Sequence, residues 1–350
     1  MNNRIQIFDF LKGIAVLLMI QVHIVELFAT QSFFESSTGK FLLFLGGPPV
    51  APVFLIAFGF FLAKRKTNNS HLFKRALFIL FIGLMLNILL NLNLILKVLM
   101  GLISLDIKPY IFGVDILINA ALSLLIILFL KSIFKENTIP YIIIIIISAF
   151  LGNFLISFNV ENQYVMYFLS FFYGAATWSY FPLFPWLSYT LTGYVIYLIT
   201  KNIKQTNYEI NNNVKILLFA FFILFLFFTL RFVISIASDV QHNLTYYHHG
   251  FIFYIWVIIF LLFYTFFLNL LVTYLKNTYT VKYLKWLGKN VTLIYVVQWI
   301  IIGNIATEIF KTVNSIYILF FSFIAITVTS TFIVYLLLKI RGRNKGVQAT

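Results

Sequence analysis

Two ionisable residues in the first apolar segment, Lys12 and His23, are the residues whose types and spacing most clearly suggest chemistry. They are eleven positions apart. At 3.6 residues per turn this is about three turns, so both side chains lie on one face of a helix, roughly 16 Å apart. Asp9 and Glu26 fall within about 60° of the same stripe. An ionisable side chain in a membrane-length segment is costly unless it faces protein or water. The pattern therefore predicts a polar path through a helix bundle and a functional role for His23.

Each of the two residues also has a purely structural interpretation. His23 would then be satisfied by a neighbouring carbonyl group, and Lys12 would anchor the end of the helix among lipid headgroups. Within a membrane span the cost of placing an ionisable group favours function for His23. The position of Lys12 at the inner end of the segment is compatible with both interpretations.

The composition indicates that the elements carrying these residues lie in a membrane. The chain has 350 residues, of which 62% are hydrophobic and 10% are charged, and its mean hydropathy is +0.98. Apolar stretches of about 20 residues, long enough to cross a bilayer, recur along its length. The chain has no cysteine and therefore no disulfide framework and no thiolate metal site. Arg4 precedes the first stretch without a small-residue cleavage site after it, which predicts a retained helix rather than a signal peptide.

We expect an all-α fold, a polytopic transmembrane helix bundle that forms a single domain over residues 1–340, followed by a short basic cytoplasmic tail over residues 341–350. No internal repeat is visible, so a transporter built on inverted repeats gains no support. A short interfacial helix is expected within residues 93–110. The ten predicted spans are residues 8–28, 41–63, 72–92, 111–133, 139–158, 183–200, 214–237, 250–275, 290–310 and 314–338.

The distribution of basic residues predicts the orientation of the bundle. With both termini in the cytoplasm, 20 of the 25 Lys and Arg residues fall on the cytoplasmic side, as the positive-inside rule requires. The exceptions are Lys40, Lys97, Lys108, Arg231 and Lys311. Topology thus accounts for most of the formal charge of +15, and we expect no nucleic-acid partner.

Proline and basic residues mark the two ends of the second span. The segment 46–55 contains Pro48, Pro49 and Pro52, and proline disrupts a helix because it lacks the backbone donor. This predicts either an ordinary loop-to-helix entry or a broken backbone beside protein or a water-filled cavity. The basic cluster after the span satisfies topology and anionic lipid headgroups, or it binds a polyphosphate ligand. The cluster consists of Lys64, Arg65, Lys66, Lys74 and Arg75.

Charged and imidazole side chains occur near the outer ends of later spans. Asp115 opens the fourth span, Arg231 lies within the seventh, and Asp239 lies at the outer end of the seventh. Buried opposite charges usually pair, so these residues predict either a structural ion-pair network or the lining of an acceptor pocket. The loop that follows contains His242, His248 and His249. Because His248 and His249 are adjacent and lack the spacing of a zinc helix motif, we expect no metal site.

The first helix resembles that of integral-membrane acyltransferase family three. The segment Asp9-Phe10-Leu11-Lys12-Gly13-Ile14-Ala15, followed by His23, keeps the spacing of an arginine and a histidine in that family, with lysine in place of arginine. Other segments look more like the related heparan-α-glucosaminide N-acetyltransferase catalytic domain, namely residues 49–59, 114–117 and 181–186. Residues 287–299 resemble a late segment of both groups that often ends in histidine, where this chain has Gln298. The similarity extends in order over nearly the whole chain.

The resemblance implies a bundle of ten or eleven helices that passes an acyl group from cytoplasmic acyl-CoA, with acetyl-CoA as the expected donor, to an acceptor across the membrane. The acceptor would be a hydroxyl or amine of an extracytoplasmic glycan or similar small molecule, and the membrane a bacterial plasma membrane. Membrane lipids and this acceptor are the implied partners. The pantetheine arm of CoA would follow the polar stripe to His23. CoA itself would bind near Lys12, Lys64, Arg65, Lys74 and Arg75.

Within this scheme the expected catalytic residues are His23, Glu26 and Asp115. His23 would deprotonate the acceptor as a general base or take the acyl group as a nucleophile, and the sequence leaves both open. Glu26 or Asp115 would orient the imidazole and set its tautomer. The broken backbone near Pro48 to Pro52 would supply polar groups for the oxyanion. The expected acceptor contacts are Arg231, Asp239, His248 and His249.

Two other classes of function stay open on the sequence. A transporter or flippase for a polysaccharide or lipid-linked sugar would use the polar stripe as a permeation path, and it would move substrate without consuming acyl-CoA. A non-catalytic acyltransferase-like sensor would explain the lysine at position 12 and the glutamine at position 298, and it would bind CoA without turnover.

Overall fold

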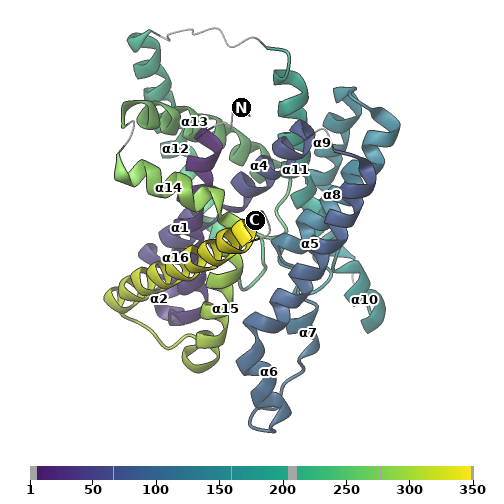
Figure 1. The fold of residues 1–350 in the computed structure, drawn as a ribbon, viewed down its shortest axis with the longest axis vertical. Helices are drawn as coiled ribbons and strands as arrows, with labels where there is room; N and C mark the ends of the chain where they lie inside the picture. The colour runs from purple at the N-terminus through teal and green to yellow at the C-terminus, as the bar shows by residue number, and fades with distance from the viewer. Residues whose placement is uncertain (1–5, 66, 159, 204–210, 276–277, 348–350) are drawn as a thin grey trace. The chain divides into compact units, whose positions relative to one another are not determined.

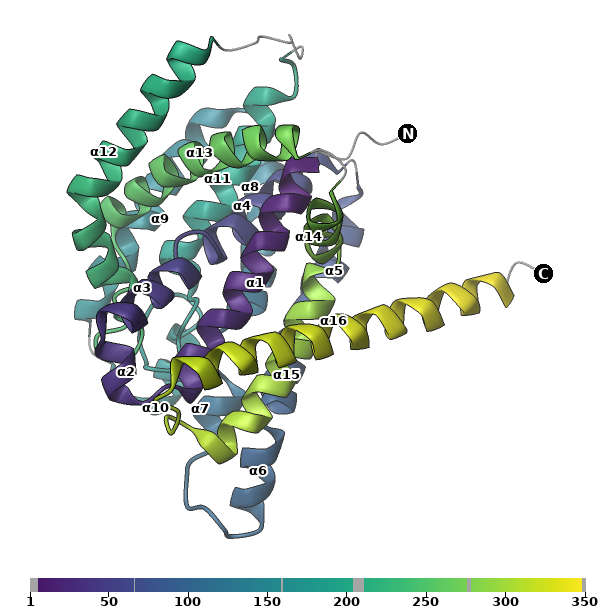
Figure 2. The ribbon, with the colours of Figure 1, turned by 90° about the vertical axis from the view of Figure 1, so that its left-hand side faces the viewer.

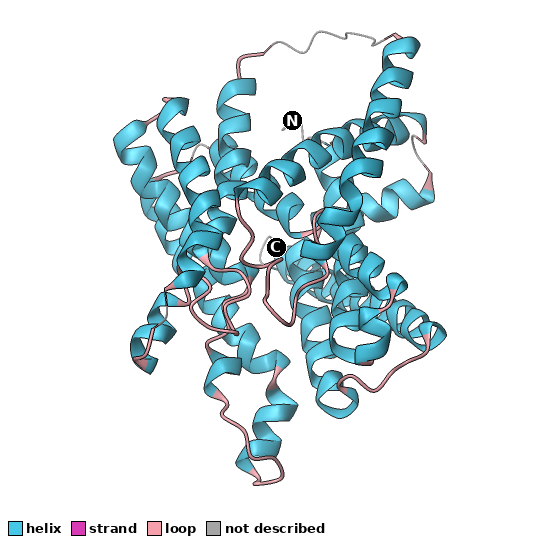
Figure 3. Cartoon of the chain, turned by 180° about the vertical axis from the view of Figure 1, so that it is seen from behind, coloured by secondary structure: helices cyan, strands magenta, loops and turns pink. Residues whose placement is uncertain are grey.

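The computed structural model describes residues 6–65, 67–158, 160–203, 211–275 and 278–347, with backbone alone for residues 342–347. Within these ranges every regular element is a helix (Figure 3), which confirms the all-α fold. Of the residues counted above as cytoplasmic, Arg4, Lys66, Lys204 and Lys276 lie outside the described ranges. The end of the expected basic tail, residues 348–350, also lies outside them.

The predicted spans correspond closely to the observed helices. In the described part of the chain, nine helical segments are long and apolar enough to cross a membrane. The sixth predicted span, residues 183–200, is also a helix, but Pro185 and hydroxyl residues such as Ser188 and Thr190 make it less apolar than the others. The nine segments are Gln6–Phe28, Ser37–Lys64, Asn69–Leu90, Ile116–Phe134, Thr138–Ser157, Asn212–Ala237, Phe251–Tyr274, Val291–Ile309 and Ile316–Arg341.

The chain divides into two compact units, whose helices are labelled in Figure 1. The first unit contains residues Met1–Val53, Leu84–Phe112 and Thr265–Thr350, and the second contains Phe54–Gly83 and Gly113–Tyr264. Three helices have residues in both: α4 (Ala51–Lys64), α5 (Asn69–Leu90) and α13 (Phe251–Tyr274).

Helix α1 is the central helix of the first unit. It contacts α3, α14, α15 and α16, and Figure 2 shows the last three of these beside it. Much of its apolar surface is buried, including Ala15, Val16 and Ile20. The helices of this unit are α1 (Gln6–Phe28), α2 (Gln31–Glu35), α3 (Ser37–Gly46), α6 (Leu92–Leu99), α7 (Lys108–Ile111), α14 (Tyr279–Lys289), α15 (Val291–Ile309) and α16 (Ile316–Val347).

Glycines bring α1 and α14 into close contact at the end of α1 that carries Lys12. A Cβ atom at Gly13 would overlap the backbone carbonyl of Leu284, and one at Gly288 would overlap that of Asp9. Small residues of this kind let two helix backbones approach closely where lipid surrounds them. The amphipathic helix α14 therefore packs directly on α1.

The second predicted span is broken within its length. Helix α3 ends at Gly46, a turn occupies residues 47–50, and α4 begins at Ala51. All four turn residues are buried, as expected for irregular backbone that is packed against protein. A Cβ atom at Gly46 would overlap the side chain of Val22, the residue before His23. The break therefore lies beside α1 at the level of His23.

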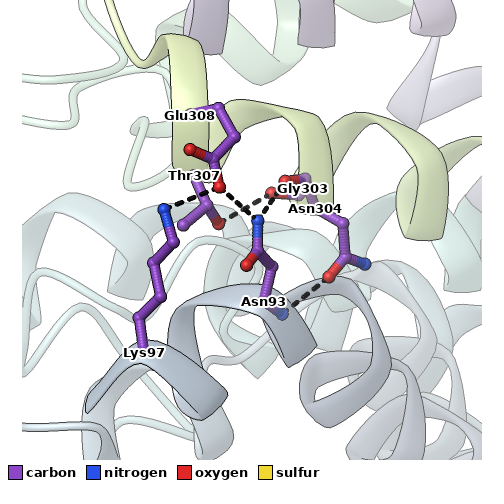
Figure 4. A network of polar contacts seen from close by, with 6 residues as sticks. All are labelled: Asn93, Lys97, Gly303, Asn304, Thr307 and Glu308. Carbon is purple, nitrogen blue, oxygen red and sulfur yellow. Dashed lines mark hydrogen bonds and ion pairs between the residues drawn. The ribbon is translucent and has the colours of Figure 1, made fainter. Parts of the chain in front are cut away.

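Polar contacts tie α6 to α15 (Figure 4). The backbone N–H of Asn93 donates to Asn304 Oδ1 at 2.8 Å, and Asn93 Nδ2 donates to the Asn304 carbonyl at 3.2 Å and to Glu308 Oε1 at 2.8 Å. Lys97 Nζ pairs with Glu308 Oε1 at 2.6 Å. Helices α6 and α7 confirm the short helix expected within residues 93–110. The polar contacts of α6 restrain the half of α15 that follows Gln298.

Helix α11 forms the core of the second unit, where it packs against α8 and α9. Trp186 and Tyr189 of α11 are fully buried. A Cβ atom at Gly193 would overlap the carbonyl of Ile56, and one at Gly59 would overlap that of Thr190, so α11 and α4 are in close backbone contact. The further elements of this unit are α8 (Ile116–Phe134), α9 (Thr138–Phe154), the 3-10 turn η1 (Leu155–Ser157), α10 (Gln163–Leu169), α11 (Leu183–Thr200) and α12 (Asn212–Ala237).

Candidate active site

The imidazole of His23 is held by two consecutive residues of α15. His23 Nδ1 lies 3.2 Å from Gln298 Oε1. The imidazole also stacks on the indole of Trp299, with ring centroids 3.8 Å apart and an interplanar angle of 29°. Gln298 is fully buried, whereas His23 is half-buried. The ring thus has a fixed plane and a fixed direction.

A second hydrogen bond decides which nitrogen of His23 carries the proton. Gln298 Nε2 donates to the backbone carbonyl of Tyr295 at 3.2 Å, so the amide oxygen is the group turned toward His23. An oxygen only accepts, and Nδ1 must therefore carry the hydrogen in this contact. The neutral imidazole is then the Nδ1–H tautomer, and Nε2 holds the lone pair. Nε2 is the atom that can take a proton or attack a carbonyl carbon.

Gln298 and Trp299 were not among the residues expected to form the site. Gln298 stands out in the sequence only as a departure from a family pattern, and no local signal pairs it with a residue 275 positions away. The expectation that Glu26 orients the imidazole stays a prediction. Glu26 is half-buried and lies three residues after His23, close to the same stripe of α1.

A further polar side chain on α1, that of Gln21, has both amide atoms buried. Within the described residues neither atom has a hydrogen-bond partner. Burying an amide without a partner costs about 1–3 kcal/mol. On the helical wheel Gln21 is about 160° from His23, on the face that also carries half-buried Ile14, Leu17 and Leu18. A bound polar group on this face would satisfy the amide.

Lys12 is paired within its own helix. Its Nζ lies 3.2 Å from Asp9 Oδ1, and the two side chains are only 13% and 3% exposed. The backbone carbonyl of Asp9 is also the group that contacts Gly288 of α14. A shielded carboxylate next to the ammonium lowers the net positive charge that Lys12 offers to a ligand.

The basic cluster lies on the connection between α4 and α5, in the second unit. Arg65 and Lys74 are exposed, and Lys64 and Arg75 are half-buried. The Arg75 guanidinium lies over the ring of Phe58, 6.0 Å from its centroid. Such an arrangement presents several cations at one end of a pair of spans, which suits either anionic headgroups or a polyphosphate.

Asp115 caps helix α8. Its Oδ1 accepts hydrogen bonds from the backbone N–H groups of Leu117 at 2.9 Å and Ile118 at 3.1 Å. This satisfies two of the donors that the start of a helix leaves unpaired, and the carboxylate also suits the positive end of the helix dipole. The catalytic role expected for Asp115 stays a prediction, whereas its capping role follows from the observed bonds.

Arg231 does not lie in a buried ion-pair network. The guanidinium is exposed on α12. Helix α12 packs on α13 through a narrow face that includes Phe225, which stacks on Trp256, and Thr229, which accepts from the Trp256 indole at 2.8 Å. Arg231 lies on the opposite side of the helical wheel. The burial expected from the sequence is therefore wrong, because α12 is apolar on all sides and its sequence does not mark the packed face.

Asp239, His248 and His249 belong to the connection between α12 and α13. Asp239 accepts from the Asn243 backbone N–H at 3.1 Å and from the Thr245 hydroxyl at 3.0 Å. His248 and His249 are buried, and burial lowers the pKa of both, that of His249 to about 3. Both are therefore neutral at physiological pH, and contact of either with an acceptor stays a prediction.

The hydrogen bonds of the two histidines lie within the fold. His248 Nε2 donates to the Ser179 carbonyl at 2.7 Å, and His249 Nδ1 donates to the Tyr246 carbonyl at 2.7 Å. His249 Nε2 then accepts from the Tyr189 hydroxyl at 2.9 Å. Across the described ranges no group of three or more His, Asp or Glu side chains is placed to hold a metal ion.

Comparison with known proteins gives one family. Residues 4–226 match the model of the family described as heparan-α-glucosaminide N-acetyltransferase, catalytic. No curated protein and no solved structure matches the chain. The matched range includes α1 with Lys12 and His23, the broken second span and the basic cluster.

Proposed function

The chain belongs to the heparan-α-glucosaminide N-acetyltransferase catalytic family, and from this premise we propose that it transfers an acetyl group from acetyl-CoA, across the membrane, to a hydroxyl or amine of an extracytoplasmic glycan or similar acceptor. It is an integral multi-pass membrane protein, and the family is one of acetyltransferases. The single observation that carries the proposal for the site is the oriented imidazole of His23, whose Nε2 is left as the basic nitrogen.

His23 acts in the proposed reaction through Nε2. As a general base it takes the proton of the acceptor hydroxyl or amine while the acceptor oxygen or nitrogen attacks the thioester carbonyl. The carbon–sulfur bond then breaks, and the imidazolium returns the proton to the CoA thiolate. Alternatively Nε2 attacks the thioester first and expels the CoA thiolate; the acceptor then displaces the imidazole from the acetyl group, and its proton passes to the thiolate. Gln298 holds Nδ1–H in both cases, so the same nitrogen reacts.

The buried amide of Gln21 supports a polar ligand next to α1. This face of α1 lies about 160° from His23, so the ligand expected there is not the pantetheine arm that reaches His23 along the polar stripe. Lys64, Arg65, Lys74 and Arg75 are proposed to bind the phosphates of CoA, for which Arg supplies bidentate donors and Lys supplies charge. Lys12 of the first unit, shielded by Asp9, stays a predicted contact of the cofactor.

The broken backbone at residues 47–50 is the proposed source of polar groups for the oxyanion. Its support is that Gly46 packs on Val22, next to His23. Preorganised donors at the position of a developing negative charge are usually the largest single contribution to acyl transfer. Replacing Pro48 and Pro49 by alanine, which restores the backbone donors of a helix, is expected to lower turnover without altering the binding of CoA.

The test of the function is transfer of labelled acetyl from acetyl-CoA in membranes that contain the chain. His23→Ala is expected to abolish the transfer, and His242→Gln, which changes an exposed histidine, is the matched control. Unchanged transfer in His23→Ala would remove His23 from the mechanism. Movement of a glycan or lipid-linked sugar without consumption of acetyl-CoA would replace the proposal by a transporter, and CoA binding without turnover on any acceptor would favour a sensor.

A second measurement separates the two roles of His23. Rapid acid quenching of the reaction before acceptor is added, followed by mass spectrometry of the peptide that contains His23, detects an acetyl-imidazole. Its accumulation supports the nucleophile. Its absence, together with a requirement for acceptor before any CoA is released, supports the general base.

A further inference from the structure

An open groove lies between α14 and α16 of the first unit, and His23 is not among its lining residues. Its volume is about 480 Å³ and its lining is almost wholly apolar, formed by Tyr283, Trp286, Val328, Thr331, Phe332 and Tyr335. This volume lies in the range of about 300–1,000 Å³ that small-molecule sites occupy. The Tyr283 hydroxyl and the Thr331 hydroxyl are hydrogen-bonded to each other at 3.0 Å, so these two polar groups of the lining satisfy one another. The groove therefore suits an apolar occupant.

The exposed face of α14 combines aromatic and basic side chains. The buried face of this helix carries Val281, Leu284 and Leu287. By helical spacing Tyr279, Lys282, Tyr283, Trp286 and Lys289 share the other face. Lys285, at the border, donates to Gln6 Oε1 at 2.8 Å. A helix that carries tyrosine, tryptophan and lysine on one face is typical of the membrane–water interface.

On α16 the groove leads to a cation. Val328, Phe332, Tyr335 and Lys339 follow at spacings of four, three and four residues, so they form one stripe along the helix. Val328, Phe332, Tyr335 and Lys339 are all exposed. The apolar part of the stripe is thus followed, one turn later, by a lysine. An apolar groove that ends at a cation is complementary to a molecule with an acyl chain and an anionic head.

We propose that the groove between α14 and α16 binds one acyl chain of an anionic phospholipid, with the lipid phosphate at Lys339. The two aromatic side chains of α14, Tyr283 and Trp286, pack along the chain. The charge complementarity of the groove's end selects an anionic lipid over a zwitterionic one. This site is independent of the acetyl transfer proposed above, and its test uses no measurement of activity.

The test is quenching of Trp286 fluorescence by lipids that carry bromine on one acyl chain, in the purified full chain in detergent. The contribution of Trp286 is the difference between the wild type and Trp286→Phe. Dibrominated phosphatidylglycerol is expected to quench it at about a fivefold lower concentration than dibrominated phosphatidylcholine, because one lysine near an anionic lipid contributes about this factor. Lys339→Gln is expected to remove the preference, whereas Lys215→Gln, which alters a lysine in the first turn of α12, leaves it intact.

A second variant tests the groove itself. Val328→Phe adds bulk inside the groove at an exposed position, and it is expected to reduce the quenching by both lipids. Leu337→Phe, on the opposite side of α16, is the matched control. The proposal is overturned if both lipids quench Trp286 equally in the wild type, or if Lys339→Gln keeps the preference. It is also overturned if the lipids quench Trp286 in Val328→Phe as strongly as in the wild type.

Discussion

Replacing Gln298 by leucine tests whether the amide positions His23 for reaction. Leucine has a similar volume, so the core of α15 stays filled, but the acceptor for His23 Nδ1–H and the donor to the Tyr295 carbonyl are both lost. The neutral imidazole is then free to place its hydrogen on Nε2, where it can neither take a proton nor attack a thioester. A net hydrogen bond contributes about 0.5–1.5 kcal/mol, and a buried donor left unsatisfied costs about 1–3 kcal/mol.

These magnitudes convert to a rate. Each 1.4 kcal/mol or so is a factor of ten, so kcat of Gln298→Leu is expected to fall by about 5- to 100-fold. KM for acetyl-CoA is expected to stay within about twofold, because the amide acts on the ring and not on the donor. Gln298→His is the control, since an imidazole nitrogen can also accept from Nδ1–H, and it is expected to keep most of the activity.

The assay is the initial rate of acetyl transfer at varied acetyl-CoA, with thermal unfolding of each variant measured in the same detergent. The reasoning is refuted if Gln298→Leu unfolds at the wild-type temperature and keeps the wild-type kcat. It is equally refuted if Gln298→His is as impaired as Gln298→Leu, because a loss that does not depend on the acceptor is a packing effect.

Three further predictions concern other parts of the chain. Gln21→Leu removes a buried amide without a partner within the described residues, so it is expected to stabilise the protein by about 1 kcal/mol; a lower melting temperature than that of the wild type would contradict this. Burial lowers the pKa of His249 to about 3, below the value of about 6.5 in an unfolded chain. Because the unfolded state therefore binds the proton first, the free energy of unfolding is expected to fall as the pH drops from about 6.5 towards 3. The slope is up to about 1.4 kcal/mol per pH unit. Denaturation at several pH values checks this slope, which His249→Phe should flatten and His242→Gln should not. Gly193→Leu is expected to prevent the contact of α11 with the α4 carbonyl and to destabilise the second unit by about 1–3 kcal/mol or more, as thermal unfolding would show.

Features of the fold that depend on local sequence could be predicted. A stretch of about 20 apolar residues can satisfy its backbone in lipid only as a helix, so the nine apolar spans of the described residues follow from hydropathy alone. The break at residues 47–50 follows equally from Pro48 and Pro49, which cannot donate within a helix. The cap at Asp115 is also a local signal, an aspartate directly before an apolar helix.

The packed face of a helix could not be read where the sequence has no polar side. Helix α12 carries phenylalanine all round, so nothing in it separates the face on Trp256 from the face with Arg231. In water an arginine marks the exposed side of an amphipathic helix, but in an apolar span it marks either a buried partner or a side chain that extends toward the headgroups. The structure gives the exposed position.

The partner of His23 required the tertiary structure, and its chemical type has a physical reason. The sequence pointed to a carboxylate, because carboxylates commonly orient catalytic histidines. A carboxylate beside the half-buried ring would have to stay ionised at membrane depth, where an unpaired charge is strongly disfavoured. The amide of Gln298 accepts the same hydrogen bond without a charge, and its second hydrogen bond, to Tyr295, prevents it from turning round. A neutral acceptor with a fixed direction sets the tautomer of His23 at a lower desolvation cost than a carboxylate would. For this reason Gln298, which departs from the family pattern in the sequence, is the residue that orients the imidazole.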